Sequence, residues 1–261
     1  MPYRYAWLGV AALLVLALYV FWPGFISRLG EHGWAHHLHG ITATLWMVLL
    51  IAQSVLVDRR DFTRHRWLGR SLLGLAPLFT AAGFMMLQTM TASERPFANT
   101  FGDALCFVDG LATLAFAAFC YAALANRRNP ALHGGYLLVT PGLLVMAVVT
   151  RLPFFDDLLP DWTWQARFSF TFDLAMLIVL VAALVMGLRH RRHPQPFVAL
   201  GVVTLVQGIG FHTLGNWAPW NAVADAIAST PTAVMGLIGL AVGGFAVWHG
   251  WRSSTSRARR A

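Results

Sequence analysis

Long apolar stretches separated by short polar segments follow one another along almost the whole chain. A helix of about 20 apolar residues is long enough to span the hydrocarbon core of a bilayer. The pattern therefore predicts an all-α fold, a polytopic membrane helical bundle with eight transmembrane helices. The predicted spans cover about residues 5–22, 37–57, 67–90, 104–125, 133–152, 168–188, 197–217 and 231–251.

The composition indicates a single membrane domain. Of the 261 residues, 57% are hydrophobic and 11% are charged, and the mean hydropathy is +0.60. Such a chain is too apolar for a soluble domain and is long enough for one compact helical bundle. We therefore expect one transmembrane domain over residues 1–261, with the lipid bilayer as its surroundings.

Arginine accounts for all 19 basic residues, because the sequence contains no lysine. A retinal Schiff base therefore cannot form, which excludes a rhodopsin-type photoreceptor. When the segments between spans are assigned to alternate sides, 15 arginines fall on one side and 4 on the other. The positive-inside rule makes the richer side cytoplasmic, so both termini are predicted to be cytoplasmic. The net charge of +8 then reflects topology, and we expect no nucleic-acid partner.

Two polar loops resemble each other and suggest a repeat of helices 2–3 and 4–5. The sequence Asp-Arg-Arg-Asp at 58–61 precedes His65, and Asn-Arg-Arg-Asn at 126–129 precedes His133 with the same spacing. Short basic loops often look alike, so a chance likeness is an equally good interpretation. If the repeat exists, the two histidines lie at equal membrane depth on the cytoplasmic side.

Histidines at the ends of spans are candidate haem ligands, because neutral imidazole binds iron and facing helices can each supply one. His65 and His133 form a candidate pair on the cytoplasmic side, and His39 and His212 form one on the outer side. The leading hypothesis is thus b-type haem binding for transmembrane electron transfer, with quinol or a periplasmic redox protein as a partner. A weaker alternative is a surface metal held by His36, His37 and His39.

A second group of polar residues lies in or near the outer halves of the spans. Charged groups inside a membrane are costly and tend to face a partner or a pathway, so this group predicts a polar vestibule. It supports a different hypothesis, a cofactor-free small-molecule or proton transporter or a receptor; an accessory membrane subunit is a third. The group comprises Gln88, Asp103, Asp109, Arg151, Arg167, Asp173 and Asn216.

Several motifs together resemble a family of uncharacterised bacterial multi-span membrane proteins. They are His-x-His-Gly at 37–40, Leu-Trp at 45–46 with Gln53, His-Arg-x-Leu-Gly at 65–69, and Asn-Pro-x-x-His at 129–133. The arrangement is more distantly similar to cytochrome b561-type di-haem proteins. The resemblance implies a multi-pass protein of the bacterial inner membrane. The predicted fourth span has no histidine to pair with His39, unlike the di-haem pattern.

Overall fold

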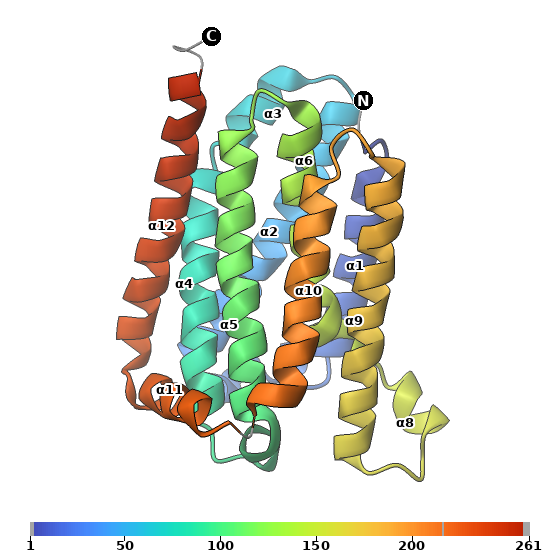
Figure 1. The fold of residues 1–261 in the computed structure, drawn as a ribbon, viewed down its shortest axis with the longest axis vertical. Coiled ribbons are helices and arrows are strands. Elements are labelled where there is room, and N and C mark those ends of the chain that lie inside the picture. The colour runs from blue at the N-terminus through green and yellow to red at the C-terminus, as the bar shows by residue number, and fades with distance from the viewer. Residues whose placement is uncertain (1–2, 216, 258–261) are drawn as a thin grey trace.

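The computed structural model describes residues 3–215 and 217–257, and all of its regular elements in these ranges are helical (Figure 1). In chain order they are α1 (Ala6–Phe21), the 3-10 segment η1 (Ile26–Glu31), α2 (Trp34–Asp58), α3 (Phe62–Gly69), α4 (Leu72–Thr91), α5 (Pro96–Ala125), α6 (Pro130–Leu138), the 3-10 segment η2 (Thr140–Leu144), α7 (Val145–Val149), α8 (Phe154–Leu158), α9 (Trp164–Arg189), α10 (Gln195–Leu214), α11 (Ala218–Ser229) and α12 (Thr232–Arg257).

Within these described ranges, seven segments are long and apolar enough to cross a membrane. They are α2, α4, α5, the combined segment Pro130–Val149, α9, α10 and α12. Helix α1 is apolar but has only 16 residues, about 24 Å at the helical rise, which is shorter than a hydrocarbon core of about 30 Å. The all-helical membrane fold is thus confirmed with seven candidate spans, and the eighth span and the repeat stay predictions.

Helix α5 lies at the centre of the bundle and packs against α4, α6, α10 and α12. Helix α12 packs along α4, where two glycines let the backbones approach closely. A Cβ atom on Gly239 would lie 2.7 Å from the Cα of Ala81, and one on Gly243 would lie 2.7 Å from the Cα of Pro77. Small residues therefore set the separation of these two helices, as is usual for membrane helix pairs.

The third predicted span begins later than its predicted start at residue 67. Residues 62–69 form the separate helix α3, and the long helix α4 begins at Leu72. The carboxylate of Asp61 accepts a hydrogen bond from the Arg64 backbone N–H and so caps the start of α3. Arg64 and Arg66 make α3 too polar to enter the bilayer, so His65 precedes the span on a helix of its own.

The fifth predicted span is interrupted in its middle. Helix α6 gives way at Thr140 to the 3-10 segment η2, and α-helical geometry returns at Val145. Pro141 lacks an N–H and its ring clashes with the preceding turn, which breaks an α-helix. The Thr140 hydroxyl donates to the Leu137 carbonyl at 2.7 Å and thereby satisfies one acceptor at the break.

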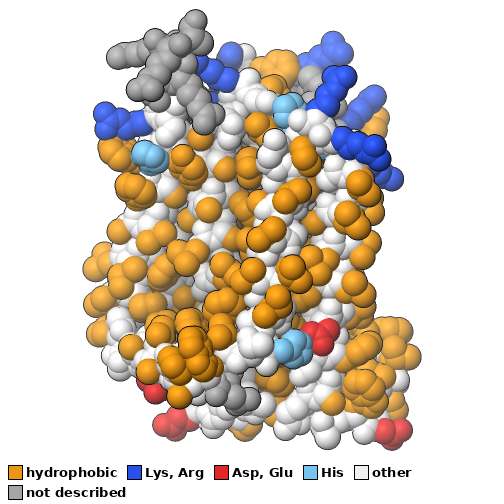
Figure 2. All heavy atoms as spheres, viewed as in Figure 1, with side chains coloured by type: hydrophobic (Ala, Val, Ile, Leu, Met, Phe, Trp, Pro, Cys, Tyr) orange, Lys and Arg blue, Asp and Glu red, His pale blue; other side chains and the backbone are white. Residues whose placement is uncertain are grey.

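The surface has the distribution of side chains expected of a multi-pass membrane protein. Figure 2 shows apolar side chains around the middle of the visible face, arginines at the end where α12 finishes, and acidic groups at the opposite end. Helix α1 begins, and α12 ends, at this arginine-rich end, where α3 also lies (Figure 1). The outward faces of α9 and α10 expose Leu177, Val181, Leu184, Val198, Val202 and Leu205.

Candidate functional site

Helix α2 carries a stripe of polar and aromatic side chains on its inward face. His39, Trp46 and Gln53 recur every seven positions, which is close to two helical turns. Trp46 and Gln53 are buried, and the Trp46 indole N–H donates to the Thr140 hydroxyl at 2.8 Å. The stripe thus runs from the acidic end toward the arginine-rich end and is joined midway to the break in the fifth span.

At the arginine-rich end, His65 of α3 and His133 of α6 approach each other. Their ring centres are 6.5 Å apart and their planes are nearly perpendicular, at 86°. Each histidine lies four positions after the residue that caps its helix, and its backbone N–H donates to the carbonyl of that residue, Asp61 or Asn129. Equivalent caps therefore place both rings in the first turns of their helices. We call Gln53, His65 and His133 the paired-histidine site.

The surroundings favour neutral imidazoles at this site. The His133 Nδ1 donates to the Ala123 carbonyl oxygen at 2.9 Å, which leaves Nε2 as the nitrogen with a free lone pair. Burial, and then the neighbouring His133, lower the pKa of His65 from its ordinary value of 6.5, while the Gln53 backbone acts in the opposite direction. Neutral imidazole is the form that binds metals.

Buried polar atoms without a hydrogen-bond partner are concentrated on α2 and α3. Among the described residues they are Nδ1 of His36, His39 and His65, and both amide atoms of Gln53. Buried polar groups nearly always have partners, and exceptions often mark a functional site. Four of these five atoms belong to the α2 stripe and the paired-histidine site, and the fifth, on His36, lies one turn before His39 on α2. This region therefore has free hydrogen-bonding groups for a polar ligand.

The structure does not bring the outer histidine pair together. The His39 ring contacts Phe79 of α4, with ring centres 5.4 Å apart, whereas the His212 Nε2 lies 2.7 Å from the Asp173 carboxylate on α9. From His39 an aromatic series continues through Phe79 and Phe116 to Trp46, with successive ring centres 4.7 Å apart after Phe79. His39 thus adjoins the aromatic interior, and His212 lies on another face of the bundle.

The histidine cluster at the start of α2 does not form a metal centre. His36 and His39 are one turn apart and lie near the same face of α2, whereas His37 points away from His39, because successive residues turn by about 100°. The His37 Nε2 donates to the His32 carbonyl at 3.0 Å and is therefore already engaged. In the part of the chain that the structure describes, no three His, Cys, Asp or Glu side chains gather in a way that could hold an ion, so the structure gives this prediction no support.

The charged residues of the predicted vestibule belong to separate local contacts. Arg167 pairs with Asp156 at 2.9 Å. The Arg151 guanidinium donates to its own helix at the Ala147 carbonyl and lies over the Phe21 ring, 5.0 Å from its centre. Asp109 lies within electrostatic range of Arg151 without forming one of the described ion pairs. Asp173, as described above, pairs with His212.

The remaining members of that group contact the rest of the fold. The Gln88 side chain donates to the Ala228 carbonyl at 3.3 Å and accepts from the Thr232 hydroxyl at 2.6 Å, so it fixes the α11–α12 junction on α4. The backbone carbonyl of Asp103 accepts the Trp220 indole N–H at 2.7 Å. Asn216 lies outside the described residues. These contacts give the vestibule residues individual structural roles.

Sequence reasoning missed two parts of the site. It did not identify Thr140 as the acceptor for Trp46 or the Ala123 carbonyl as the partner of His133. A threonine directly before a mid-span proline was an available signal for Thr140. The Ala123 partner is a backbone carbonyl, which every residue has, so no residue type in the sequence could indicate it. Neither a protein-family model, nor a curated protein, nor a solved structure matches this chain.

Proposed function

We propose that this membrane protein transfers single electrons through a b-type haem that His65 and His133 would hold. The observation that carries the proposal is the convergence of two imidazoles, from α3 and α6, with ring centres 6.5 Å apart beside buried amide atoms that lack partners. The proposal includes a bacterial inner-membrane location with the arginine-rich end in the cytoplasm.

The spacing of the two rings is compatible with a shared metal. A metal–nitrogen bond is about 2 Å long, so two imidazoles with ring centres 6.5 Å apart would both be close enough to hold one metal ion. The Ala123 carbonyl fixes the His133 tautomer in the way that outer partners of metal-bound histidines do.

The surroundings supply two further properties that a haem site needs. Helix α3 buries none of its residues completely, so a group that binds beside it disturbs little packing. Arg66 lies within electrostatic range of His65, and a guanidinium is a good partner for a propionate carboxylate. A bound haem would supply reversible one-electron chemistry. The chain itself supplies the ligands, their neutral state and the positive charge.

The aromatic series from His39 to Trp46 supports the electron-transfer proposal, because it extends from the middle of α2 toward the acidic end. By contrast, the residues that motivated a cofactor-free transporter are distributed over separate contacts in the described structure. The geometry therefore favours haem binding over a vestibule transporter, and quinol or a periplasmic protein remains the proposed reductant.

The test is the reduced-minus-oxidised absorbance spectrum of the full chain, purified in detergent from cells supplied with a haem precursor. We expect a b-type spectrum that is lost in His65→Ala and in His133→Ala. His193→Ala is the matched control, because His193 lies in the loop after α9 and outside the site. A monodisperse protein without a Soret band after incubation with excess haem, or unchanged spectra in both site variants, would exclude the proposal.

A further inference from the structure

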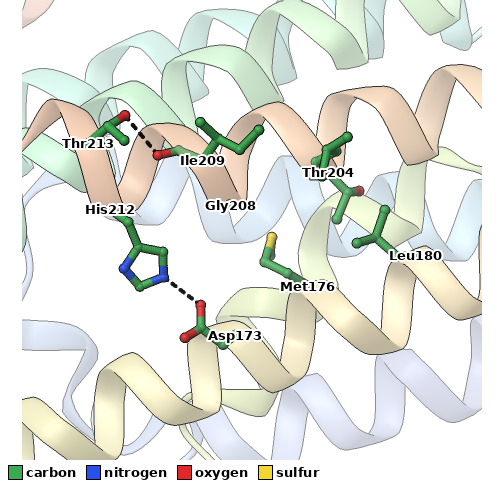
Figure 3. Close-up of a pocket in the computed structure, with 9 residues that line it drawn as sticks. Asp173, Met176, Leu180, Thr204, Gly208, Ile209, His212 and Thr213 are labelled. Atoms are coloured by element: carbon green, nitrogen blue, oxygen red, sulfur yellow. Dashed lines mark hydrogen bonds and ion pairs between the residues drawn. The ribbon is translucent and has the colours of Figure 1, made fainter.

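A groove of about 410 Å³ opens on the surface between α9 and α10, away from the paired-histidine site (Figure 3). Its volume is within the range of small-molecule sites in proteins. Figure 3 shows His212 and Asp173 pointing toward each other across one part of the groove, with apolar side chains along the rest. The lining residues are Asp173, Met176, Leu180, Thr204, Leu205, Gly208, Ile209, His212 and Thr213.

The His212–Asp173 pair offers the strongest polar groups to an occupant of this groove. The hydroxyls of Thr204 and Thr213 donate to carbonyls of their own helix, at 2.9 Å and 2.8 Å. The His212 Nε2 and a carboxylate oxygen of Asp173 are 2.7 Å apart, and their side chains are 51% and 54% exposed. The pair is therefore accessible from the groove and retains free hydrogen-bonding positions.

This pair opens onto an apolar surface. Leu205 and Ile209 of the groove are themselves exposed, as are Leu177 and Val181 on α9 and Val202 on α10. A charged or strongly polar group that faces hydrocarbon is costly unless something pairs with it. The contact between His212 and Asp173 relieves part of this cost. A molecule that brings hydrogen-bonding groups to their remaining positions and covers the adjacent apolar wall would relieve the rest.

We propose that the groove binds a membrane quinol, with its hydroxylated ring at His212 and Asp173 and its prenyl tail along Met176, Leu180 and Leu205. A quinol ring is neutral, and its hydroxyls can donate both to the Asp173 carboxylate and to the His212 Nδ1, which is an acceptor when Nε2–H donates to Asp173. The Asp173 carboxylate disfavours the phosphate of an anionic lipid, because like charges repel. The chemistry of the groove therefore matches a neutral hydroxylated head group with an apolar tail.

This site is independent of the proposed haem site. Asp173 lies in the first half of α9, which begins at the end of the bundle opposite α3 (Figure 1), and His212 lies in the last turn of α10. Quinol binding there requires no ligand at His65 or His133. Binding and haem spectra are thus separate measurements, and failure of one leaves the other proposal to be judged on its own result.

The test measures binding of decylubiquinol to the full chain in phosphatidylcholine nanodiscs prepared without quinone. His212→Leu removes the polar contact. Gly208→Leu fills the groove, because a Cβ there meets only the Met176 side chain, at an ordinary 3.9 Å. The matched control is Gly201→Leu, two turns away on α10, where a Cβ meets the Ala183 Cβ at 3.8 Å outside the groove. Thermal unfolding midpoints verify that each variant is folded.

We expect saturable binding that weakens at least about tenfold in His212→Leu and in Gly208→Leu and stays within about twofold in Gly201→Leu. Three results would overturn the proposal. They are no saturable binding to the parent chain, equal affinity in the folded groove variants and the control, and equal displacement of the quinol by phosphatidylglycerol, which would make the groove a phospholipid site.

Discussion

The hydrogen bond between Trp46 and Thr140 should couple the polar stripe of α2 to the break in the fifth span. The indole N–H donates to the Thr140 hydroxyl at 2.8 Å, and that hydroxyl donates onward to the Leu137 carbonyl at 2.7 Å. Thr140→Val keeps the shape of the side chain and removes both bonds. Trp46→Phe removes the donor instead and leaves the hydroxyl bonded to its own helix.

The two substitutions should lower the free energy of unfolding by different amounts, because they leave different groups without a hydrogen-bond partner. Trp46 is only 2% exposed, so in Thr140→Val its N–H remains buried without an acceptor, which costs about 1–3 kcal/mol. In the double variant neither group remains, so the combined loss should be smaller than the sum. Double-mutant cycles on membrane helices give coupling energies of roughly 0.6 kcal/mol on average and up to about 1.7 kcal/mol. A short, fully buried bond should lie in the upper part of that range.

The assay is reversible unfolding of the parent and three variants in mixed micelles of dodecyl maltoside and sodium dodecyl sulfate. Free energies of unfolding from the four proteins close a double-mutant cycle. A Thr140→Val protein as stable as the parent, or a coupling energy indistinguishable from zero, would refute the reasoning that this bond holds α2 to η2.

Three further predictions follow from the structure. Burial lowers the pKa of His65 from 6.5, so the unfolded chain binds the proton more readily than the folded chain does. The contribution of His65 to the free energy of unfolding should therefore be complete above pH 6.5 and should decrease as the pH drops. Unfolding midpoints of His65→Gln should lack this part of the pH dependence. Gly239→Val places a Cβ 2.7 Å from the α4 backbone and should lower the free energy of unfolding by about 1–3 kcal/mol, whereas Gly244→Val, with open space around its Cβ, should cost much less. For topology, a membrane-impermeant maleimide should label Glu94→Cys in spheroplasts but Arg128→Cys only after lysis, with both native cysteines buried; labelling of Arg128→Cys in intact spheroplasts would reverse the orientation.

The sequence located most of the long helices because their apolar runs are uninterrupted. Hydropathy is averaged over windows of many residues, so it does not detect interactions within a single helical turn, such as a helix cap. The Asp61 cap separates α3 from α4, although the arginines of α3 were a visible sign that it stays outside the bilayer. Likewise, Pro141 marked a possible break, but its extent depends on the Thr140 contacts on both sides.

The candidate site was also predictable only in part. Matching caps placed His65 and His133 at equivalent positions in their helices, and the structure brings their rings together. The outer group failed to assemble because a span pattern gives the depth of a residue and not the direction in which it faces across the bundle. His39 and His212 lie on helices with different neighbours, so similar depth did not make them partners.

The 3-10 segment in the fifth span also sets the rotation of one half of the span relative to the other about the helix axis. Each of its five residues turns the chain by about 120° instead of the 100° of an α-helix, so it adds roughly 100° of rotation. His133 and Arg151 are 18 positions apart, five full turns of an uninterrupted helix, and would otherwise point the same way. Because of this offset, the fifth span directs the His133 imidazole to Ala123 of α5 at one end and the Arg151 guanidinium to Phe21 of α1 at the other end. Inserting a single residue into η2 would therefore redirect one end of the span relative to the other without changing either half.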